Sequence, residues 1–317
     1  MENKICIIGI YFGKLPNYFS LWLKSCAYNP TIDFLLFSDN ILTELPENVK
    51  VYQVTLKKIK EKISHLVGFT VCLEKPYKIC DYRPIYGQLF SDYLLRYDYW
   101  GHCDFDLIFG DLQYFFDYYN LYKYDRFNAL GHLSLYRNTE EVNQRYKCTG
   151  SNYDYKTIFL TNKNCVFDEM PGMTAIYLKN SFPFFTKRIF ADIASIYDRF
   201  RLIDKYKLDI QAVNYPFQIF YWENGKCFRA FYTNKILNKE EYLYIHFKKR
   251  KNFQVMFDDN SSKSFYITKY GFYEKKQEVT KEIIKKLNPY KGIIYESFEK
   301  IWFYFKIYFN ILKNKLI

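Results

Sequence analysis

Short apolar runs alternate with helix-like stretches over the first 112 residues, and this alternation constrains the fold more than any other feature of the chain. Runs of strand length, each bounded by Pro, Asn, Asp or Gly, occur at residues 5–12, 32–37 and 49–54. Apolar residues at helical spacing lie at 18–27 and 56–67, and a further helix is expected over 85–97, after Pro84. This order predicts an α/β fold with parallel strands, whose ligand crevice lies beyond the carboxyl ends of the strands.

The remainder of the chain is less regular. We expect helices near residues 112–119, from Asn138 to about 147 and at 182–199, and strands at 127–136, 215–221, 227–232 and 242–247. No internal repeat and no Gly/Ser-rich linker occurs before residue 275. Residues 1–275 are therefore predicted to form one domain.

Two carboxylates one residue apart follow an aromatic, extended stretch. Asp104 and Asp106 flank Phe105, directly after residues 97–103 and before the apolar residues 107–109. In an extended backbone, side chains at i and i+2 leave the same face, so both carboxylates can converge on one cation while Phe105 packs the other way. Mg²⁺ and Mn²⁺ prefer such oxygen ligands. The triplet predicts a metal site at a strand end, although Asp is also a common residue of turns and caps.

Composition limits the compartment and the partners. The eight cysteines are scattered without a CxxC pair, which fits neither a zinc module nor a disulfide framework and indicates reduced thiols in a cytosolic compartment. The first apolar run is too short for a secretory signal. The sequence contains no uninterrupted run of eighteen or more apolar residues, so we expect no membrane-spanning helix. The net charge of +12 and the aromatic content of 22% suit nucleic-acid binding, but a genome rich in AT codons is a competing explanation for both.

The residues around the triplet resemble a known enzyme family. The similarity lies in Asp81-Tyr82-Arg83-Pro84-Ile85-Tyr86-Gly87 and residues 97–112, and more loosely in residues 131–138 and 167–169. These segments are similar to bacterial nucleotide-sugar glycosyltransferases of the GT-A fold, especially a group associated with capsule and lipopolysaccharide synthesis. The resemblance covers about residues 4–246. It implies a Rossmann-like, mixed but mainly parallel sheet flanked by helices, with a nucleotide-sugar half at about 1–112 and an acceptor half at about 113–275.

The resemblance also implies a donor site with a bound Mn²⁺ or Mg²⁺. Breaking the bond between sugar and diphosphate builds negative charge on the leaving group, so a cation on the phosphates is the largest available stabilisation. Asp106 is expected to ligate the metal, and Asp104 to ligate it or to bind the donor ribose. Gly9, Tyr11 and Phe12 end the first strand, where such an enzyme lays its nucleobase; an ordinary strand-to-loop turn is the competing interpretation.

A third metal ligand is expected from a distant strand end. His246 resembles the late histidine that completes the metal site in related lipopolysaccharide galactosyltransferases, where nearby basic residues contact the diphosphate. Lys249 is the corresponding phosphate contact, although the family's Gly and Lys after the histidine are not reproduced cleanly. The competing interpretation is a half-buried strand histidine followed by a solvated basic loop.

Two further charged groups have two interpretations each. Lys78, Asp81 and Arg83 precede an expected helix and suit ribose or phosphate binding, or a helix cap with a surface salt bridge. Asp168 and Glu169 follow an apolar run, where they suit a general base for the acceptor, positioning of the acceptor, or a capping role.

The last part of the chain has its own composition. Residues 281–317 contain eight Lys against three Glu, and residues 291–317 interleave Lys with apolar and aromatic side chains. A basic aromatic helix of this type commonly lies in a membrane interface, attracted by anionic headgroups. Residues 276–317 are therefore predicted to form an amphipathic helical extension that binds an anionic membrane surface. A terminal helix packed on the body, or a dimer contact, is the competing interpretation.

The triplet and the resemblance together predict a metal-dependent hexosyltransferase. We expect it to use a UDP-sugar as the nucleotide-sugar donor and a saccharide or lipid-linked saccharide as the acceptor, in lipopolysaccharide or capsule synthesis. The expected location is the cytoplasm, at the inner face of the cytoplasmic membrane, with no nucleic-acid partner. Two other functions remain open: a basic, non-catalytic protein that binds RNA or membrane, and a metal-dependent nucleotidyltransferase.

Overall fold

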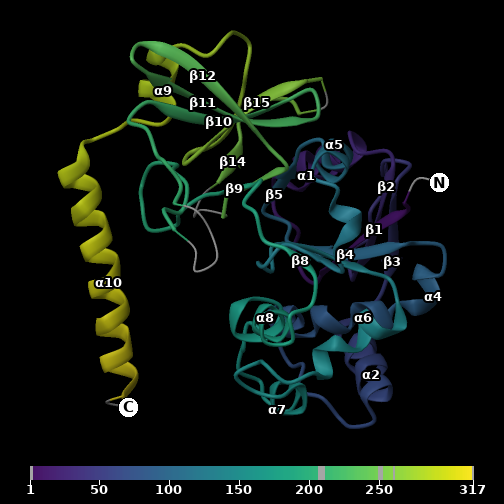
Figure 1. Ribbon diagram of the computed structural model, residues 1–317. Coiled ribbons are helices and arrows are strands. Elements are labelled where there is room, and N and C mark those ends of the chain that lie inside the picture. The colour runs from purple at the N-terminus through teal and green to yellow at the C-terminus, as the bar shows by residue number, and fades with distance from the viewer. Residues whose placement is uncertain (1–2, 206–210, 249–252, 260, 316–317) are drawn as a thin grey trace. The chain divides into compact units, whose positions relative to one another are not determined.

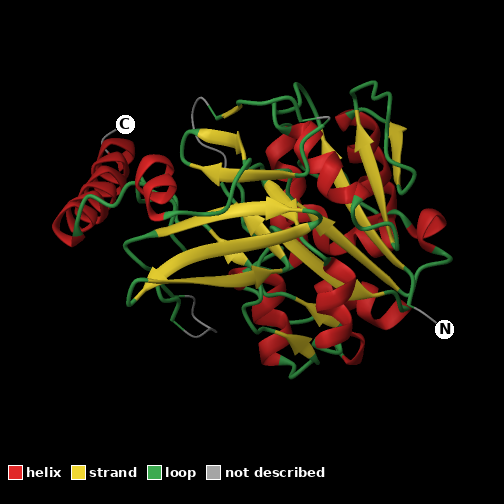
Figure 2. Ribbon diagram, turned by 90° about the horizontal axis from the view of Figure 1, so that it is seen from above, coloured by secondary structure: helices red, strands yellow, loops and turns green. Residues whose placement is uncertain are grey.

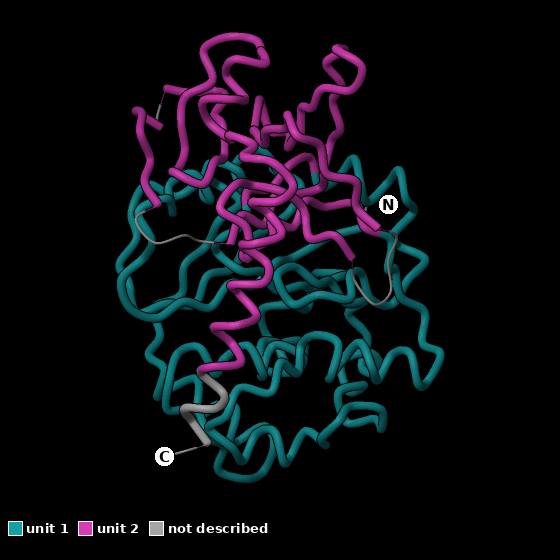
Figure 3. The backbone as a smooth tube through the Cα atoms, turned by 90° about the vertical axis from the view of Figure 1, so that its left-hand side faces the viewer, with its two compact units in different colours: residues 1–107, 112–187 teal, residues 108–111, 188–317 magenta. Residues whose placement is uncertain are grey.

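The computed structural model describes residues 3–205, 211–248, 253–259 and 261–315 (Figure 1). The chain forms two compact units. The first contains residues 1–107 and 112–187, and the second contains residues 108–111 and 188–317 (Figure 3). Residues 112–187 belong to the first unit because their strands extend its sheet.

A seven-stranded mixed sheet is the centre of the first unit, with the order β3-β2-β1-β4-β7-β6-β8. The four strands from β3 to β4 are mutually parallel, β7 is antiparallel to both of its neighbours, and β6 and β8 are parallel. The bounds are β1 (Ile5–Tyr11), β2 (Ile32–Ser38), β3 (Val49–Gln53), β4 (Tyr99–Cys103), β6 (Arg126–Phe127), β7 (Leu133–Arg137) and β8 (Phe184–Phe185). The predicted α/β fold with a mixed, mainly parallel sheet is confirmed.

Helices and turns connect these strands (Figure 2). The α-helices of the first unit are α1 (Phe19–Ala27), α2 (Leu56–Val67), α3 (Tyr86–Leu89), α4 (Ser91–Leu94), α5 (Leu112–Tyr118), α6 (Glu140–Gln144), α7 (Tyr155–Phe159) and α8 (Ala175–Lys179). Shorter turns are the 3₁₀ segments η1 (Pro76–Ile85), η2 (Leu121–Lys123) and η3 (Arg145–Lys147), and the π-turn η4 (Met170–Thr174).

Alternating side chains of β2 pack on opposite faces of the sheet, as the two-residue period of a strand requires. The ring of Phe34 contacts Trp22 of α1, with 5.8 Å between centroids. The ring of Phe37 stacks on Phe90 at 4.1 Å, within a large core that also includes Ile59 and Ile63 of α2. Burial on both faces explains why the central strands are apolar throughout.

The second unit contains two sheets. The six-stranded sheet has the order β12-β11-β10-β15-β16-β14 and is antiparallel except for the parallel pair β14 and β16. Its strands are β10 (Gln218–Glu223), β11 (Lys226–Thr233), β12 (Ile236–Tyr242), β14 (Gln254–Val255), β15 (Ser264–Thr268) and β16 (Gly271–Glu274). The three-stranded sheet has the order β5-β13-β9, with β5 (Leu107–Phe109), β13 (Tyr244–His246) and β9 (Ala191–Asp192).

Two helices complete the second unit. Helix α9 (Lys281–Leu287) packs Ile284 against the six-stranded sheet, next to Ile219 and Phe228. Helix α10 (Ile293–Lys315) follows and is 23 residues long. Across the described residues, we find no helix with both the length and the apolar character needed to cross a bilayer.

Some local predictions are wrong. The helix expected at 182–199 is absent: that segment holds β8, which pairs with β6, and β9, which pairs with β13. The strand expected at 127–136 is two strands, and the helix expected at 85–97 is the pair of short helices α3 and α4. In each case tertiary pairing or a local break overrides the apolar period, because propensity is a weak determinant for short segments.

Candidate functional site

The Asp-Phe-Asp triplet lies at the carboxyl end of β4. Strands β1 and β4 are parallel, so this end lies beside the end of β1. The backbone N–H of Asp104 donates to the His132 carbonyl at 2.8 Å, and both Asp104 and Asp106 are half-buried. Phe105 packs away from them, as predicted, with its ring 5.0 Å from that of Trp22. Two carboxylates therefore lie at the sheet edge, where α/β folds bind ligands.

The residues at the end of β1 support this turn. A Cβ on Gly9 would lie 2.8 Å from the Phe105 ring, so the absence of a side chain makes room for Phe105. Burial and the negative charge of Asp106 raise the pKa of Tyr11, whose hydroxyl donates to the Lys14 carbonyl at 3.2 Å. Phe12 packs at the border of the core. The Tyr11 ring also meets that of Phe105 edge to face, with 5.1 Å between centroids, so the end of β1 packs against the triplet.

Arg83 links three segments of the first unit. Its guanidinium contacts the Asp104 carboxylate, donates to Asp168 Oδ2 at 2.8 Å and donates to the Gly131 carbonyl at 2.9 Å. The arginine is buried, and it comes from η1, just before Pro84. The Arg83 guanidinium thus forms ion pairs with two carboxylates that are 64 positions apart in the chain.

Among the carboxyl groups around Arg83, Asp168 has a strongly shifted pKa. Burial raises its pKa to about 7, against the opposing charge of Arg83, and the negative charges of Glu169 and Asp104 add to the rise. Asp168 is 3% exposed, whereas Glu169 is partly exposed. A carboxyl with a pKa near 7 can exchange a proton at neutral pH.

Two residues that sequence reasoning missed or left unassigned hold Asp168 in place. A Cβ on Gly131 would lie 2.3 Å from Asp168 Oδ2, so the carboxyl packs directly on the Gly131 backbone. Arg126 is fully buried, its guanidinium lies over the rings of Tyr136 and Tyr177, and it donates to the Asp168 carbonyl at 2.9 Å. The sequence around Arg126 holds other polar and charged residues and gives no signal for this role.

Lys78 and Asp81 form a buried ion pair, with 2.8 Å between Nζ and Oδ2. The Asp81 carboxylate also accepts the backbone N–H groups of Cys165 and Phe167, both at 2.9 Å. Lys78 donates to two further carbonyls, at 2.9 and 2.7 Å. This network fixes the segment that leads into Asp168. Direct binding of ribose or phosphate by either residue stays a prediction.

Asp39 is a second candidate that sequence reasoning missed. It follows β2, and its carboxylate accepts the Gly13 N–H at 2.9 Å, while Asn40 donates to the Gly13 carbonyl at 2.8 Å. An acidic residue near the end of the second strand binds ribose in dinucleotide-binding folds. The sequence feature that could have identified Asp39 is the run Ser38-Asp39-Asn40, which directly follows an apolar strand.

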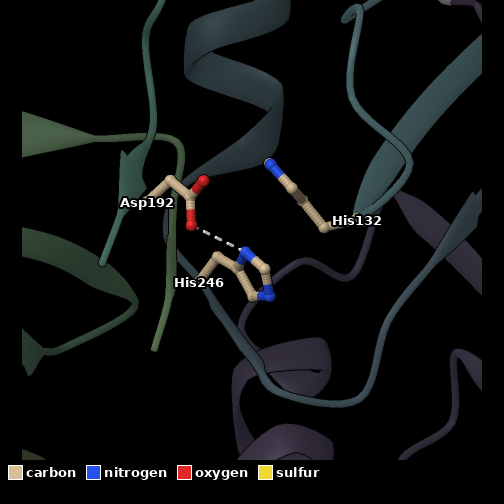
Figure 4. A group of neighbouring side chains, drawn as sticks. All are labelled: His132, Asp192 and His246. Atoms are coloured by element: carbon tan, nitrogen blue, oxygen red, sulfur yellow. Dashed lines mark ion pairs between the residues drawn. The ribbon is translucent and has the colours of Figure 1, made fainter. Parts of the chain in front are cut away.

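In the second unit, His246 ends β13 and is paired with Asp192 of β9 (Figure 4). The distance between His246 Nδ1 and Asp192 Oδ1 is 2.9 Å, and Lys248 Nζ lies 3.2 Å from the same oxygen. Both His246 and Asp192 are buried. A carboxylate on Nδ1 fixes the imidazole and directs Nε2 to any ligand, which is the usual support of a metal-binding histidine. Lys249 lies outside the described residues.

Strand β5 directly follows Asp106 in the chain and is the sheet neighbour of β13. The Gly110 N–H donates to the Leu243 carbonyl at 2.8 Å, and the Trp222 indole donates to the Phe109 carbonyl at 3.0 Å. A Cβ on Gly110 would lie 2.6 Å from the Tyr242 carbonyl, so this close pairing requires glycine.

The chain belongs to a family of unknown function, DUF6625, whose model matches residues 7–276. A search of curated proteins found no match. Among solved structures, one similar chain is the galactosyltransferase LgtC in complex with donor and acceptor sugar analogs, at 11% identity and a TM-score of 0.36, over 59% of this chain and 75% of that chain. Another is mouse xyloside xylosyltransferase 1 in its apo form. Its sequence identity is 9% and its TM-score is 0.38, and the match covers 60% of this chain and 87% of that chain. Likenesses of this size say nothing about the activity of this chain.

The raised pKa of Asp168 predicts a pH-dependent stability. The folded protein binds this proton more tightly than the unfolded chain, whose carboxyl has a pKa near 3.8. As the pH rises from about 4 to about 7, the wild type should therefore lose stability relative to Asp168→Asn, by at most about 1.4 kcal/mol per pH unit. Urea unfolding of both proteins at pH 5 and pH 7 measures the difference. Parallel pH profiles would show that the carboxyl is not perturbed.

Because Asp168 packs on Gly131, we expect substitutions at these two residues to have coupled effects on the free energy of unfolding. Gly131→Ala should destabilise the protein by about 1–3 kcal/mol, because the new methyl overlaps the carboxyl. The same substitution should cost less in an Asp168→Ala background, where that oxygen is gone. Unfolding free energies of the four proteins give the coupling. A cost that is the same in both backgrounds would contradict the contact.

Proposed function

We propose that this member of the family is a metal-dependent glycosyltransferase of the GT-A fold, which moves a hexose from a UDP-sugar to a saccharide acceptor in lipopolysaccharide or capsule synthesis. The observation that carries the proposal is the pair Asp104 and Asp106 at the carboxyl edge of a parallel sheet. Such an edge binds nucleotides in α/β folds, and paired carboxylates there suit a cation that neutralises a diphosphate.

The proposed metal ligands are Asp104, Asp106 and His246. The donor chemistry fits a divalent cation, since two carboxylates supply charge and the Asp192 carboxylate orients the imidazole of His246. Of the two cations, Mn²⁺ is the better match for a site with an imidazole ligand, because Mg²⁺ strongly prefers oxygen ligands. The metal would stabilise the leaving diphosphate.

The protein's own groups would bind and orient the substrates. Gly9, Tyr11 and Phe12 lie at the end of β1, where we propose the nucleobase binds, and Asp39 is placed to contact the ribose. Three further residues remain proposed for ribose or phosphate binding: Lys78, Asp81 and Lys249. The first two would act by fixing the segment that leads into Asp168.

Asp168 and Glu169 are the proposed acceptor-side carboxylates. Arg83 and Gly131 fix Asp168, whose raised pKa suits a group that takes up a proton from the acceptor hydroxyl. Glu169 is more exposed and would contact the acceptor first. Arg83 shares its charge between Asp104 and Asp168, so it acts as a positioning residue for both.

Asp106→Asn tests the proposal. Losing a charged ligand should lower hexose transfer by roughly 100-fold or more and abolish thermal stabilisation by UDP with Mn²⁺, while the protein stays folded. His246→Ala should have a smaller effect, roughly tenfold on Mn²⁺ affinity. Asp92→Asn is the matched control, since Asp92 is an exposed carboxylate on α4. Wild-type transfer by Asp106→Asn in chelator-treated buffer, or release of pyrophosphate instead of a nucleoside diphosphate, would refute the assignment.

We also propose that α10 binds an anionic membrane surface at the cytoplasmic face. One side of the helix carries apolar side chains at three- and four-residue spacing, all exposed: Ile294, Phe298, Ile301, Trp302, Phe305, Tyr308 and Phe309. Lys300 and Lys306 lie beside them, and Lys306 Nζ is 5.3 Å from the Trp302 ring. Such a helix gains free energy at a lipid interface from apolar burial and from headgroup charge.

The start of α10 is tied to its unit by buried charge. Glu296 contacts the guanidinium groups of Arg199 and Arg201, and Glu299 accepts the Asp198 N–H at 2.9 Å. A truncation after Glu299 therefore removes five of the seven exposed apolar side chains, from Ile301 onward, and keeps the ion pairs that connect the helix to the unit.

This truncation should reduce sedimentation with phosphatidylglycerol vesicles, with each Lys near the surface contributing about 1 kcal/mol at low salt. The aromatic part should persist at high salt, because it depends on apolar area. Lys285→Gln with Lys286→Gln on α9 is the control for charge lost outside α10, and it removes two of the four lysine charges that the truncation removes. Equal sedimentation of full-length and truncated protein would exclude the helix as the anchor, and loss of folding would favour a packed helix.

A further inference from the structure

A cavity of about 340 Å³ lies in the first unit, on the face of the sheet covered by α2. Its walls include the rings of Phe37, Tyr52, Phe90 and Tyr93. These rings form one cluster: Phe37 stacks on Tyr52 at 5.1 Å, and the Tyr52 and Tyr93 rings meet edge to face at 4.7 Å. The volume falls in the range of small-molecule sites, which is about 300–1,000 Å³.

Two lysines of α2 line the same cavity, Lys58 and Lys62. Helix α2 has four lysines, and the other two have carboxylate partners: Lys57 pairs with Glu61 at 4.0 Å and Lys60 with Glu74 at 2.5 Å. Within the described part of the chain, no carboxylate lies at ion-pair distance from Lys58 or Lys62, and none lines the cavity.

The placement of these lysines suggests a ligand charge. Lys58 and Lys62 are one turn apart on the same helix face, an arrangement in which like charges destabilise the helix. Lys62 Nζ lies 5.4 Å from the Phe90 centroid and 5.5 Å from that of Tyr93, so it stands over the aromatic wall. An anionic group bound between the two ammonium groups would relieve their repulsion and satisfy their donors.

We infer that this cavity binds a sugar ring that carries an anionic group, such as a uronic acid unit of the acceptor. Flat aromatic faces suit the C–H face of a pyranose, and the two lysines suit its carboxylate. The choice of a saccharide rests on the proposed function, whereas the preference for an anionic ring rests on the walls of the cavity. The cavity would hold a unit of the acceptor chain away from the reacting hydroxyl.

Three probes separate these features in NMR titrations of the full chain: methyl β-D-glucuronide, methyl β-D-glucoside and benzoate. The glucuronide should bind roughly tenfold or more tightly than the uncharged glucoside, because two charge-assisted contacts distinguish them. Equal binding of these two sugars, or no binding of the glucuronide, would overturn the inference. Tighter binding of benzoate than of the glucuronide would overturn the assignment to a saccharide.

Variants of α2 locate the binding. Lys58→Gln with Lys62→Gln should weaken glucuronide binding roughly tenfold, and Lys57→Gln with Lys60→Gln on the same helix should not change it. Tyr93→Leu should weaken binding of both sugars, since it removes part of the aromatic wall. An unchanged affinity in the Lys58 and Lys62 variant would contradict the site. Asp106→Asn should keep glucuronide binding, so failure of the metal proposal and failure of this one are distinguishable.

Discussion

The shared guanidinium of Arg83 is the interaction on which the first unit's site depends. It contacts the carboxyl groups of Asp104 and Asp168, which come from separate segments of the chain, and it donates to the Gly131 carbonyl. Removing a buried cation from such a group leaves uncompensated carboxylates, which is far more costly than the net gain from the ion pairs. One arginine therefore links the triplet to Asp168, and its charge opposes the rise that burial causes in the pKa of Asp168.

Much of the first unit follows from local sequence. Helix α2 was predicted to run from residue 56 to residue 67 and does so, because Thr55 accepts the Lys58 N–H at its start and Gly68 ends it at a φ of 79°. The six-stranded antiparallel sheet of the second unit was only partly foreseen. Elsewhere, two-residue segments such as 184–185 and 191–192 become strands only through partners more than fifty residues away in the chain.

The same distinction applies to the site. Asp104, Asp106 and the end of β1 were predictable, because the carboxyl ends of parallel strands meet at one edge. Arg126 and Asp192 were not, since each acts through a neighbour that the sequence does not reveal. Asp192 reaches His246 only through the register of β9 with β13, and Arg126 reaches the Asp168 carbonyl only after β6 joins the sheet.

The excess of basic residues and the high aromatic content are connected. Arg126 is fully buried, and its guanidinium lies over the rings of Tyr136 and Tyr177, 5.4 Å from each centroid. Lys239 Nζ likewise lies 3.5 Å from the Phe228 centroid. Contacts of this kind stabilise by about 0.5–2 kcal/mol each and let cations pack against apolar surface without an equal number of carboxylates. A net charge of +12 is thus compatible with a fold that uses its cations internally, and the composition alone does not indicate a nucleic-acid partner.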